Sequence, residues 1–142
     1  MKTISVKRLQ AYIVFLNLKR TAPKEFPDLD EMTVTVDVIL PAFEKHAGRF
    51  AEFNKQSDVL GNERGIGKLS DEEWKEKVAV LQKQVREYEL TSGEEIVQVE
   101  LETTAYQKFI AQFDRWGKAW FTDLQEFVNF NKALRSTDVK KE

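Results

Sequence analysis

The sequence predicts a mainly α-helical domain with a minor pair of β-strands. Apolar residues recur with the 4,3 spacing of an α-helix over several long stretches, which places them on one side of each helix. Two short segments, 3–6 and 94–102, have the alternation or the β-branched content of a strand, and one further segment, 32–40, can be interpreted as either helix or strand. We therefore expect a four-helix, bundle-like domain that contains an antiparallel helical hairpin and a short two-stranded element.

The C-terminal stretch 106–134 is expected to organise the core, because it is the most aromatic helical segment of the chain. Its main apolar seam repeats at helical spacing, and a second stripe of Phe109, Trp116 and Phe130 widens the apolar surface beside that seam. At about 25 cal/mol per Å2 of buried apolar area, each buried ring contributes roughly 2–3 kcal/mol. The rest of the chain or a partner must therefore cover this helix.

Composition limits the possible classes of protein. The 142 residues correspond to one domain, with 136–142 expected to be a frayed polar tail. A net charge of -2 gives no basic field, which disfavours nucleic acid as a partner. The chain has no cysteine, so it can form no disulfide and no thiolate metal site, as suits a protein of the cytoplasm. No run of about 20 apolar residues is present to span a membrane, and the short apolar run 11–18 is interpreted as part of the fold.

The N-terminal elements follow from local patterns. Residues 3–6 should pair with 94–102, because a lone strand needs a partner. A helix is expected over 7–19 and should end before Pro23, because the residue before a proline is pushed out of the helical region. Pro23 and Pro27 then frame a connection, and Asp28 or Asp30 is expected to cap the next helix.

The segment 32–40 allows two interpretations. Helical spacing continues from Met32 to Phe53 without a phase break, whereas apolar side chains through 34–40 also alternate as in a strand. The first interpretation is one helix kinked at Pro41. The second is a strand followed by a helix that starts at Pro41, where proline is well tolerated. The unbroken spacing favours the kinked helix.

The middle of the chain predicts a helical hairpin. Amphipathic helices over 41–57 and 70–89 are joined by a glycine-rich loop, 58–68, and should pack antiparallel. Ser70 and Glu73 have the spacing of a capping box at the start of the second helix. The loop lacks the Gly-Lys-Ser/Thr ending of a phosphate-binding loop, so we interpret it as a connection.

Few residues suggest catalysis. His46 is the single histidine and lies on the apolar side of its helix, which favours a position at the edge of the core. Without cysteine or further histidines, the usual nucleophile–base pairs and histidine-rich metal sites cannot form within one chain. Acidic clusters at 28–31, 72–73 and 94–95 fall at the starts of helices and a strand, where negative charge has a structural role. We therefore expect a protein that is not an enzyme and that binds no metal ion or cofactor. The sequence leaves open catalysis by carboxylate side chains alone.

The hairpin and the strand after it carry a resemblance. The order is LPAFEKHAGRFAEFNK, a glycine-bearing loop, SDEEWKEKVAVLQKQVREYEL and then EEIVQVELE. This layout resembles an uncharacterised group of small bacteriophage proteins and covers about 34–101. The resemblance implies a phage or prophage source, with the protein in the host cytoplasm or the virion, and it supplies no catalytic residues.

The leading functional hypothesis is a non-enzymatic protein-interaction module, either a virion or assembly accessory or an inhibitor of a host factor. Its partner would be another protein or a second copy, because the C-terminal helix carries more aromatic surface than one small bundle buries. The residues expected at this contact are Phe109, Trp116, Phe130 and Arg64.

The alternative hypothesis is a protein that sequesters a small, nucleotide-like metabolite in an aromatic pocket. The residues expected to line that pocket are Arg115, Lys118 and Trp120, which combine positive charge with an aromatic face. The two hypotheses differ in what should stabilise the native protein, since a ligand that binds only the native state raises its melting temperature.

Overall fold

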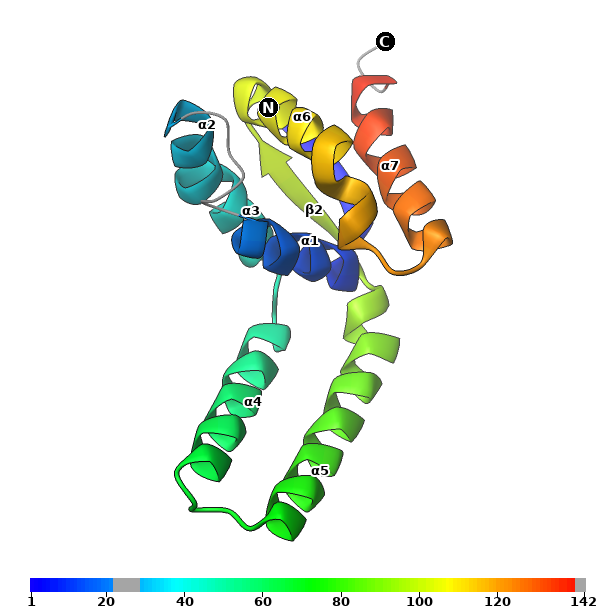
Figure 1. Ribbon diagram of the computed structural model, residues 1–142. Coiled ribbons are helices and arrows are strands. Elements are labelled where there is room, and N and C mark those ends of the chain that lie inside the picture. The colour runs from blue at the N-terminus through cyan, green and yellow to red at the C-terminus, as the bar shows by residue number, and fades with distance from the viewer. Residues whose placement is uncertain (22–28, 140–142) are drawn as a thin grey trace.

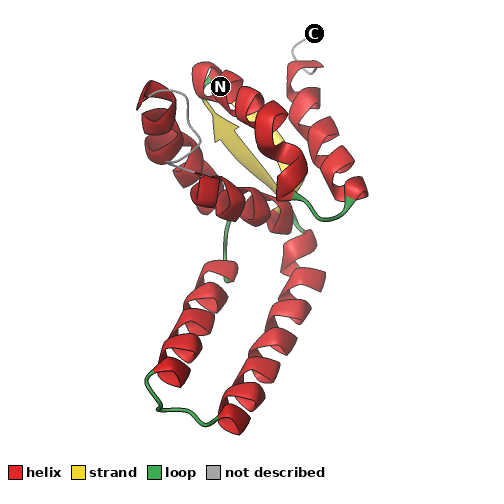
Figure 2. Ribbon diagram, viewed as in Figure 1, coloured by secondary structure: helices red, strands yellow, loops and turns green. Residues whose placement is uncertain are grey.

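A computed structural model describes residues 1–21 and 29–139, and it has the predicted mainly α-helical architecture with one two-stranded antiparallel sheet (Figures 1 and 2). The predicted connection at Pro23 and Pro27 and the cap at Asp28 lie outside the described residues. The elements in chain order are β1 (Lys2–Lys7), α1 (Arg8–Thr21), α2 (Leu29–Val34), the π-helical turn η1 (Thr35–Ile39), α3 (Leu40–Glu44), α4 (Phe50–Gly65), α5 (Asp71–Leu90), the 3-10 turn η2 (Ser92–Glu94), β2 (Ile96–Leu101), α6 (Thr103–Trp120) and α7 (Leu124–Val139).

Figure 1 shows the chain arranged as two parts. We call the sheet together with α1, α2, α3, α6 and α7 the body, and we call α4 and α5 the hairpin. The hairpin projects from one end of the body, and both termini lie at the other end. Residues 136–139 of the predicted frayed tail belong to α7, and 140–142 lie outside the described part of the chain.

The predicted pairing of the two strands is confirmed. β1 and β2 run antiparallel, with Ile4 opposite Val99 and Val6 opposite Val97. Burial alternates along both strands, so that one face of the sheet joins the core and the other carries mostly polar residues together with the exposed Ile96. Val97, Val99 and Leu101 share the buried face, as their spacing predicted.

Residues 29–44 form one helical stretch, which decides between helix and strand over 32–40. Within it, the Leu40 N–H donates to the carbonyl of Thr35, five residues back, so the backbone widens into a π-helical turn. Pro41 follows directly and has no N–H to donate to the preceding turn. The helical interpretation is therefore confirmed, and the irregularity beside Pro41 is a π-helical turn.

The chain leaves the body at Gly48, and the prediction of a continuous helix across 41–57 is wrong there. Gly48 has φ +56°, in the left-handed region that favours glycine. A Cβ atom at this position would clash with the hydroxyl group of Tyr88. Gly48 therefore separates α3 in the body from α4 in the hairpin.

The loop of the hairpin is shorter than the sequence predicted. α4 runs through Gly61 to Gly65, so residues 58–65 are helical and the connection spans 66–70. One glycine inside a helix costs only about 1 kcal/mol, which the rest of the helix offsets. The start of α5 is as predicted: Ser70 Oγ accepts the Glu73 N–H, and Glu73 Oε1 accepts the Ser70 N–H, both at 3.2 Å.

The single C-terminal helix that the sequence predicted is broken at 121–123 into α6 and α7. Asp123 Oδ1 accepts the N–H groups of Gln125 at 2.7 Å and Glu126 at 3.3 Å, so Asp123 caps α7. The acidic residue followed three places later by Glu126 is the sequence signal for this break, and the continuous aromatic spacing concealed it. Two of the four expected helices are thus divided, this one and the one that begins near residue 30.

The break folds aromatic rings against one another inside the body. The ring centroid of Phe109 lies 5.0 Å from that of Phe43, 6.1 Å from that of Trp120 and 6.3 Å from that of Phe130. One straight helix would leave rings along its flank, whereas α7 turns back beside α6 (Figure 1). Phe109 and Phe130 are thereby fully buried. The aromatic residues of the C-terminal stretch therefore build the core, as expected, but from two helices.

Candidate protein-contact site on the helical hairpin

Polar contacts around Arg8 and Tyr88 tie the base of the hairpin to the body. Arg8, the first residue of α1, donates from Nη1 to the carbonyl of His46 at 2.9 Å. Its Nη2 lies 3.3 Å from Glu95 Oε2, on the segment that leaves the hairpin. The N–H of Arg49 donates to the Tyr88 hydroxyl group at 3.0 Å. These contacts join the two chain segments that enter and leave the hairpin.

Aromatic packing also holds the base of the hairpin. Phe50 of α4 stacks on Tyr12 of α1 at 5.2 Å between ring centroids, and it meets the edge of Tyr88 at 4.7 Å. Phe53 contacts Tyr88 edge-on at 5.7 Å. Such pairs add about 0.5–1.5 kcal/mol each beyond the area that they bury. The angle at which α4 and α5 leave the body is therefore set by packed rings.

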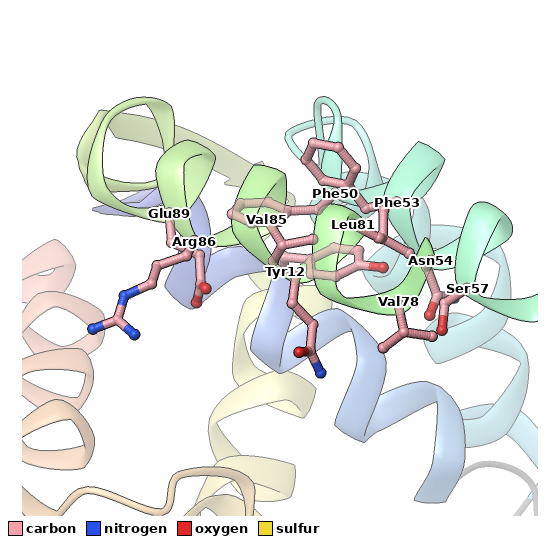
Figure 3. A pocket seen from close by; sticks show the side chains of 11 residues that line it. Tyr12, Phe50, Phe53, Asn54, Ser57, Val78, Leu81, Val85, Arg86 and Glu89 are labelled. Carbon is pink, nitrogen blue, oxygen red and sulfur yellow. The ribbon is translucent and has the colours of Figure 1, made fainter. Parts of the chain in front are cut away.

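Beyond these rings, a pocket of about 540 Å³ opens between the hairpin and α1; we call it the junction pocket. Figure 3 shows Tyr12 lying across it, with Arg86 and Glu89 at one end and Asn54 and Ser57 at the other. Its volume falls within the range of small-molecule sites. The remaining lining residues are Phe50, Phe53, Val78, Leu81, Gln82 and Val85.

The other face of the hairpin carries a hollow of about 370 Å³, which we call the outer groove. Leu81 lines both hollows and so lies between them. Val59 is 53% exposed and Val80 is 60% exposed, although both are aliphatic side chains in the middle of their helices. The full lining is Lys55, Gln56, Val59, Leu60, Lys77, Val80, Leu81 and Gln84. All eight residues belong to α4 or α5, so the groove is an uncovered apolar surface between two helices.

Sequence reasoning missed the outer groove for two separate reasons. Val59 fell in the predicted loop 58–68, so it was not placed on a helix at all. Val80 lies outside the 4,3 stripe of α5, next to Leu81 and two places from Val78. An aliphatic side chain beside the main stripe of an amphipathic helix is the signal that indicates this second apolar surface.

The contact surface predicted on the C-terminal stretch is wrong for two of its three aromatic residues. Phe109 and Phe130 are both 0% exposed, because α7 packs against α6 and covers them. Trp116 is half-buried, and the guanidinium group of Arg115 lies 4.5 Å from its ring centroid. Phe109 and Phe130 therefore stabilise the body and are not available to a partner in this conformation.

Arg64, the fourth predicted contact residue, lies near the tip of the hairpin. Its guanidinium group is 4.0 Å from the ring centroid of Trp74, and its Nη2 is 3.2 Å from Asp71 Oδ1. Both partners belong to α5, so Arg64 fastens the end of α4 to the start of α5. It remains exposed, and a contact between Arg64 and a partner stays a prediction.

The structure does not bring Arg115, Lys118 and Trp120 together as one ligand site. Trp120 is buried in the core, whereas Lys118 is exposed. Arg115 forms an ion pair with Glu31 of α2. The junction pocket, lined by Tyr12, Phe50 and Phe53, matches an aromatic ligand better than the three predicted residues do.

His46 lies where the segment after α3 meets β2, and its environment predicts a pH dependence. Burial lowers the pKa of His46, and the positive charges of Lys45 and Arg8 lower it further, against a hydrogen bond to the Gln98 backbone and the charge of Glu100. The unfolded chain therefore binds a proton more readily than the folded chain, and stability is lost as pH falls through the ordinary histidine range. We expect unfolding in urea to show this loss between about pH 7 and 5, and we expect His46→Gln to reduce it. An unchanged slope in the variant would contradict this assignment.

Carboxylate side chains also lie beside His46. Asp37 and Glu100 line the same surface hollow of about 690 Å³, and both are exposed. Acid–base residues of active sites are usually set apart from bulk water by burial. Over 1–21 and 29–139, no group of three or more histidine or acidic side chains is placed to hold a metal ion. This hollow therefore has fewer features of a site than the hairpin.

Comparisons with family models, curated proteins and solved structures gave no match to the chain. Among the helices of the described residues, none combines the length and the apolar character needed to cross a membrane.

Proposed function

We propose that this protein is a non-enzymatic protein-interaction module whose hairpin meets the partner. The observation that carries the proposal is the outer groove, where Val59 and Val80 are more than half exposed on a projecting pair of helices. Helices normally bury such a stripe against a further layer of structure, and no element within residues 1–21 and 29–139 covers it. Following the phage-like layout, the partner would be a component of a virion or its assembly, or a host factor.

The firm base of the hairpin supports a binding role. Contacts of Arg8, Phe50 and Tyr88 fix where α4 and α5 leave the body. A surface that is already ordered loses less conformational entropy when a partner binds, so more of the contact energy appears as affinity.

The binding free energy available from apolar contact limits the affinity that the groove can provide alone. Covering Val59 and Val80 would contribute roughly 1–2 kcal/mol each. A nanomolar complex needs about 12 kcal/mol in total. A tight complex must therefore include further contacts along the hairpin, with the groove as one part of the interface.

Site-specific photo-cross-linking tests the proposal. A photoreactive phenylalanine derivative is placed at Val80, in the cells where the protein acts, and adducts are compared with those from Lys132 on the exposed side of α7. We expect a discrete protein adduct from Val80 and none from Lys132. Adducts from Lys132 together with none from Val80 would contradict the proposal, because the partner would then contact the body.

A second candidate function is sequestration of a small ligand, and the junction pocket favours it. Its aromatic lining of Tyr12, Phe50 and Phe53 and its size suit a flat, ring-containing molecule. Nucleoside monophosphates and aromatic amino acids should then raise the melting temperature, and Ser57→Trp, which fills the pocket, should remove the effect. An equal rise in the filled variant, or no rise with any of these compounds, would count against this function.

A further inference from the structure

We infer that the outer groove receives an amphipathic α-helix of a partner protein, with aliphatic side chains facing the groove and acidic residues at both ends of the contact. This inference rests on the proposed function and specifies the chemistry of the partner. Three properties of the groove support it: the nature of its walls, the placement of its charges, and the poor match between the groove and a second copy of itself.

The walls of the groove favour a helix over an extended segment. Both walls are helices, α4 and α5, whose backbone groups in the groove are already bonded within each helix. An extended segment would bring its own N–H and C=O groups onto an apolar surface that offers no backbone partners. A helix satisfies these groups internally. On α5 the groove extends from Lys77 to Gln84, about two helical turns at 1.5 Å per residue.

The charges that line the groove are both positive. Lys55 lies in the second turn of α4, near the body, and Lys77 lies in the second turn of α5, near the tip. The helices are antiparallel (Figure 1), and the groove extends from Lys55 to Leu60 on α4 and from Lys77 to Gln84 on α5, so these two lysines occupy opposite ends of the groove. Glu52, Glu63 and Glu76 lie on the same helices but outside the groove lining. A partner helix with acidic residues at both ends therefore complements the groove.

These lysines are not engaged by the ion pairs that hold the fold. Among the described residues, none of the ion pairs includes Lys55 or Lys77. Lys77 lies one turn from Glu73 and lowers the pKa of that carboxyl group through its charge, after the larger effect of the Ser70 hydrogen bonds. Both side chains stay exposed, so they can move toward a partner without breaking an ion pair that stabilises the body.

A second copy of this chain is a poor occupant of the groove. In a two-fold dimer the same patch meets itself, so Lys55 and Lys77 would face the same lysines of the other copy. Like charges around a small apolar contact oppose association. The groove therefore favours a partner of different sequence.

Two designed peptides test the inference with the full-length protein. Both are 18-residue amphipathic helices with leucine on one face; one has glutamate at both ends of that face and the other has lysine. Fluorescence anisotropy of labelled peptide at low salt gives each affinity. We expect the glutamate peptide to bind about fivefold tighter or more, and the difference to shrink as salt is added.

Matched protein variants show whether the two lysines cause that preference. Lys55→Glu/Lys77→Glu should reverse it, whereas Lys75→Glu/Lys132→Glu makes the same change in net charge away from the groove and should retain it. Circular dichroism verifies that α5 remains helical in the double glutamate variant. If that variant loses helical structure, Lys55→Gln/Lys77→Gln is used in its place and should abolish the preference for the glutamate peptide.

Several results would overturn the inference. Equal affinity of the two peptides, no binding of either, or reversal by the control variant would each do so. A wild-type dimer that Val80→Asp dissociates would also overturn it, because the occupant would then be a second copy. If any of these results is obtained while Val80 still cross-links to a partner protein, the proposed function stands and only the inference of an acidic partner helix is wrong.

Discussion

Phe109→Ala is expected to lower the free energy of unfolding by about 3–5 kcal/mol, as for other large-to-small changes in packed cores. Phe109 is 0% exposed, and its ring contacts Phe43, Trp120 and Phe130 from α3, α6 and α7. Removing the ring leaves a cavity where these helices meet. Urea unfolding followed by circular dichroism measures the change. With a typical domain stability of 5–15 kcal/mol, this loss would remove a large share of the total stability.

Leu124→Ala is the matched control for this prediction. Leu124 is 76% exposed at the start of α7, so the truncation should change the free energy of unfolding by about 0.5 kcal/mol or less. If Phe109→Ala were as mild as this control, Phe109 would be outside the core, and the interface that the sequence predicted there would again be open.

Gly48→Ala is expected to lower the free energy of unfolding by about 2–4 kcal/mol, and to do so by loosening the attachment of the hairpin. The backbone at Gly48 has φ +56°, which costs a residue with a side chain roughly 1–2 kcal/mol. The added methyl group would also displace the Tyr88 hydroxyl group, which accepts the N–H of Arg49. Tyr88 packs on Phe50 and Phe53, so it cannot move without disturbing the base.

Gly61→Ala provides the contrast for Gly48. Gly61 lies within α4, and a Cβ atom there meets nothing within 4 Å. Alanine at this position should stabilise the protein by about 0.5–1 kcal/mol. Equal effects of the two substitutions in urea unfolding would show that Gly48 has no special role at the base of the hairpin.

The elements that sequence reasoning identified are those specified by local signals. The Ser70–Glu73 capping box fixed the start of α5, and alternating aliphatic residues fixed the buried face of β2. Neither of the two predicted strands is next to another strand in the sequence, which implied that they pair with each other. Each of these features depends on residues within a few positions of one another, or on the need of a strand for a partner.

The errors concern features that tertiary packing decides. The apolar spacing across 106–134 fits one helix as well as two. The chain breaks at the Asp123 cap because a turn there lets α7 pack against α6 and bury Phe109 and Phe130. Gly48 is one of several glycines in the sequence, and only the approach of Tyr88 shows why the break occurs there. The outer groove required α4 to extend through Val59, which glycine-based loop prediction had excluded.

The affinity of the partner for Val80→Asp tests the central claim most directly, once cross-linking has identified that partner. Val80 is 60% exposed, so the substitution should leave the fold intact while placing a charge in the outer groove. We expect the Kd to rise by about tenfold or more, and Trp116→Ala on α6 to leave it within about twofold. An unchanged Kd for Val80→Asp together with a large rise for Trp116→Ala would contradict the account and return the contact surface to the C-terminal helices.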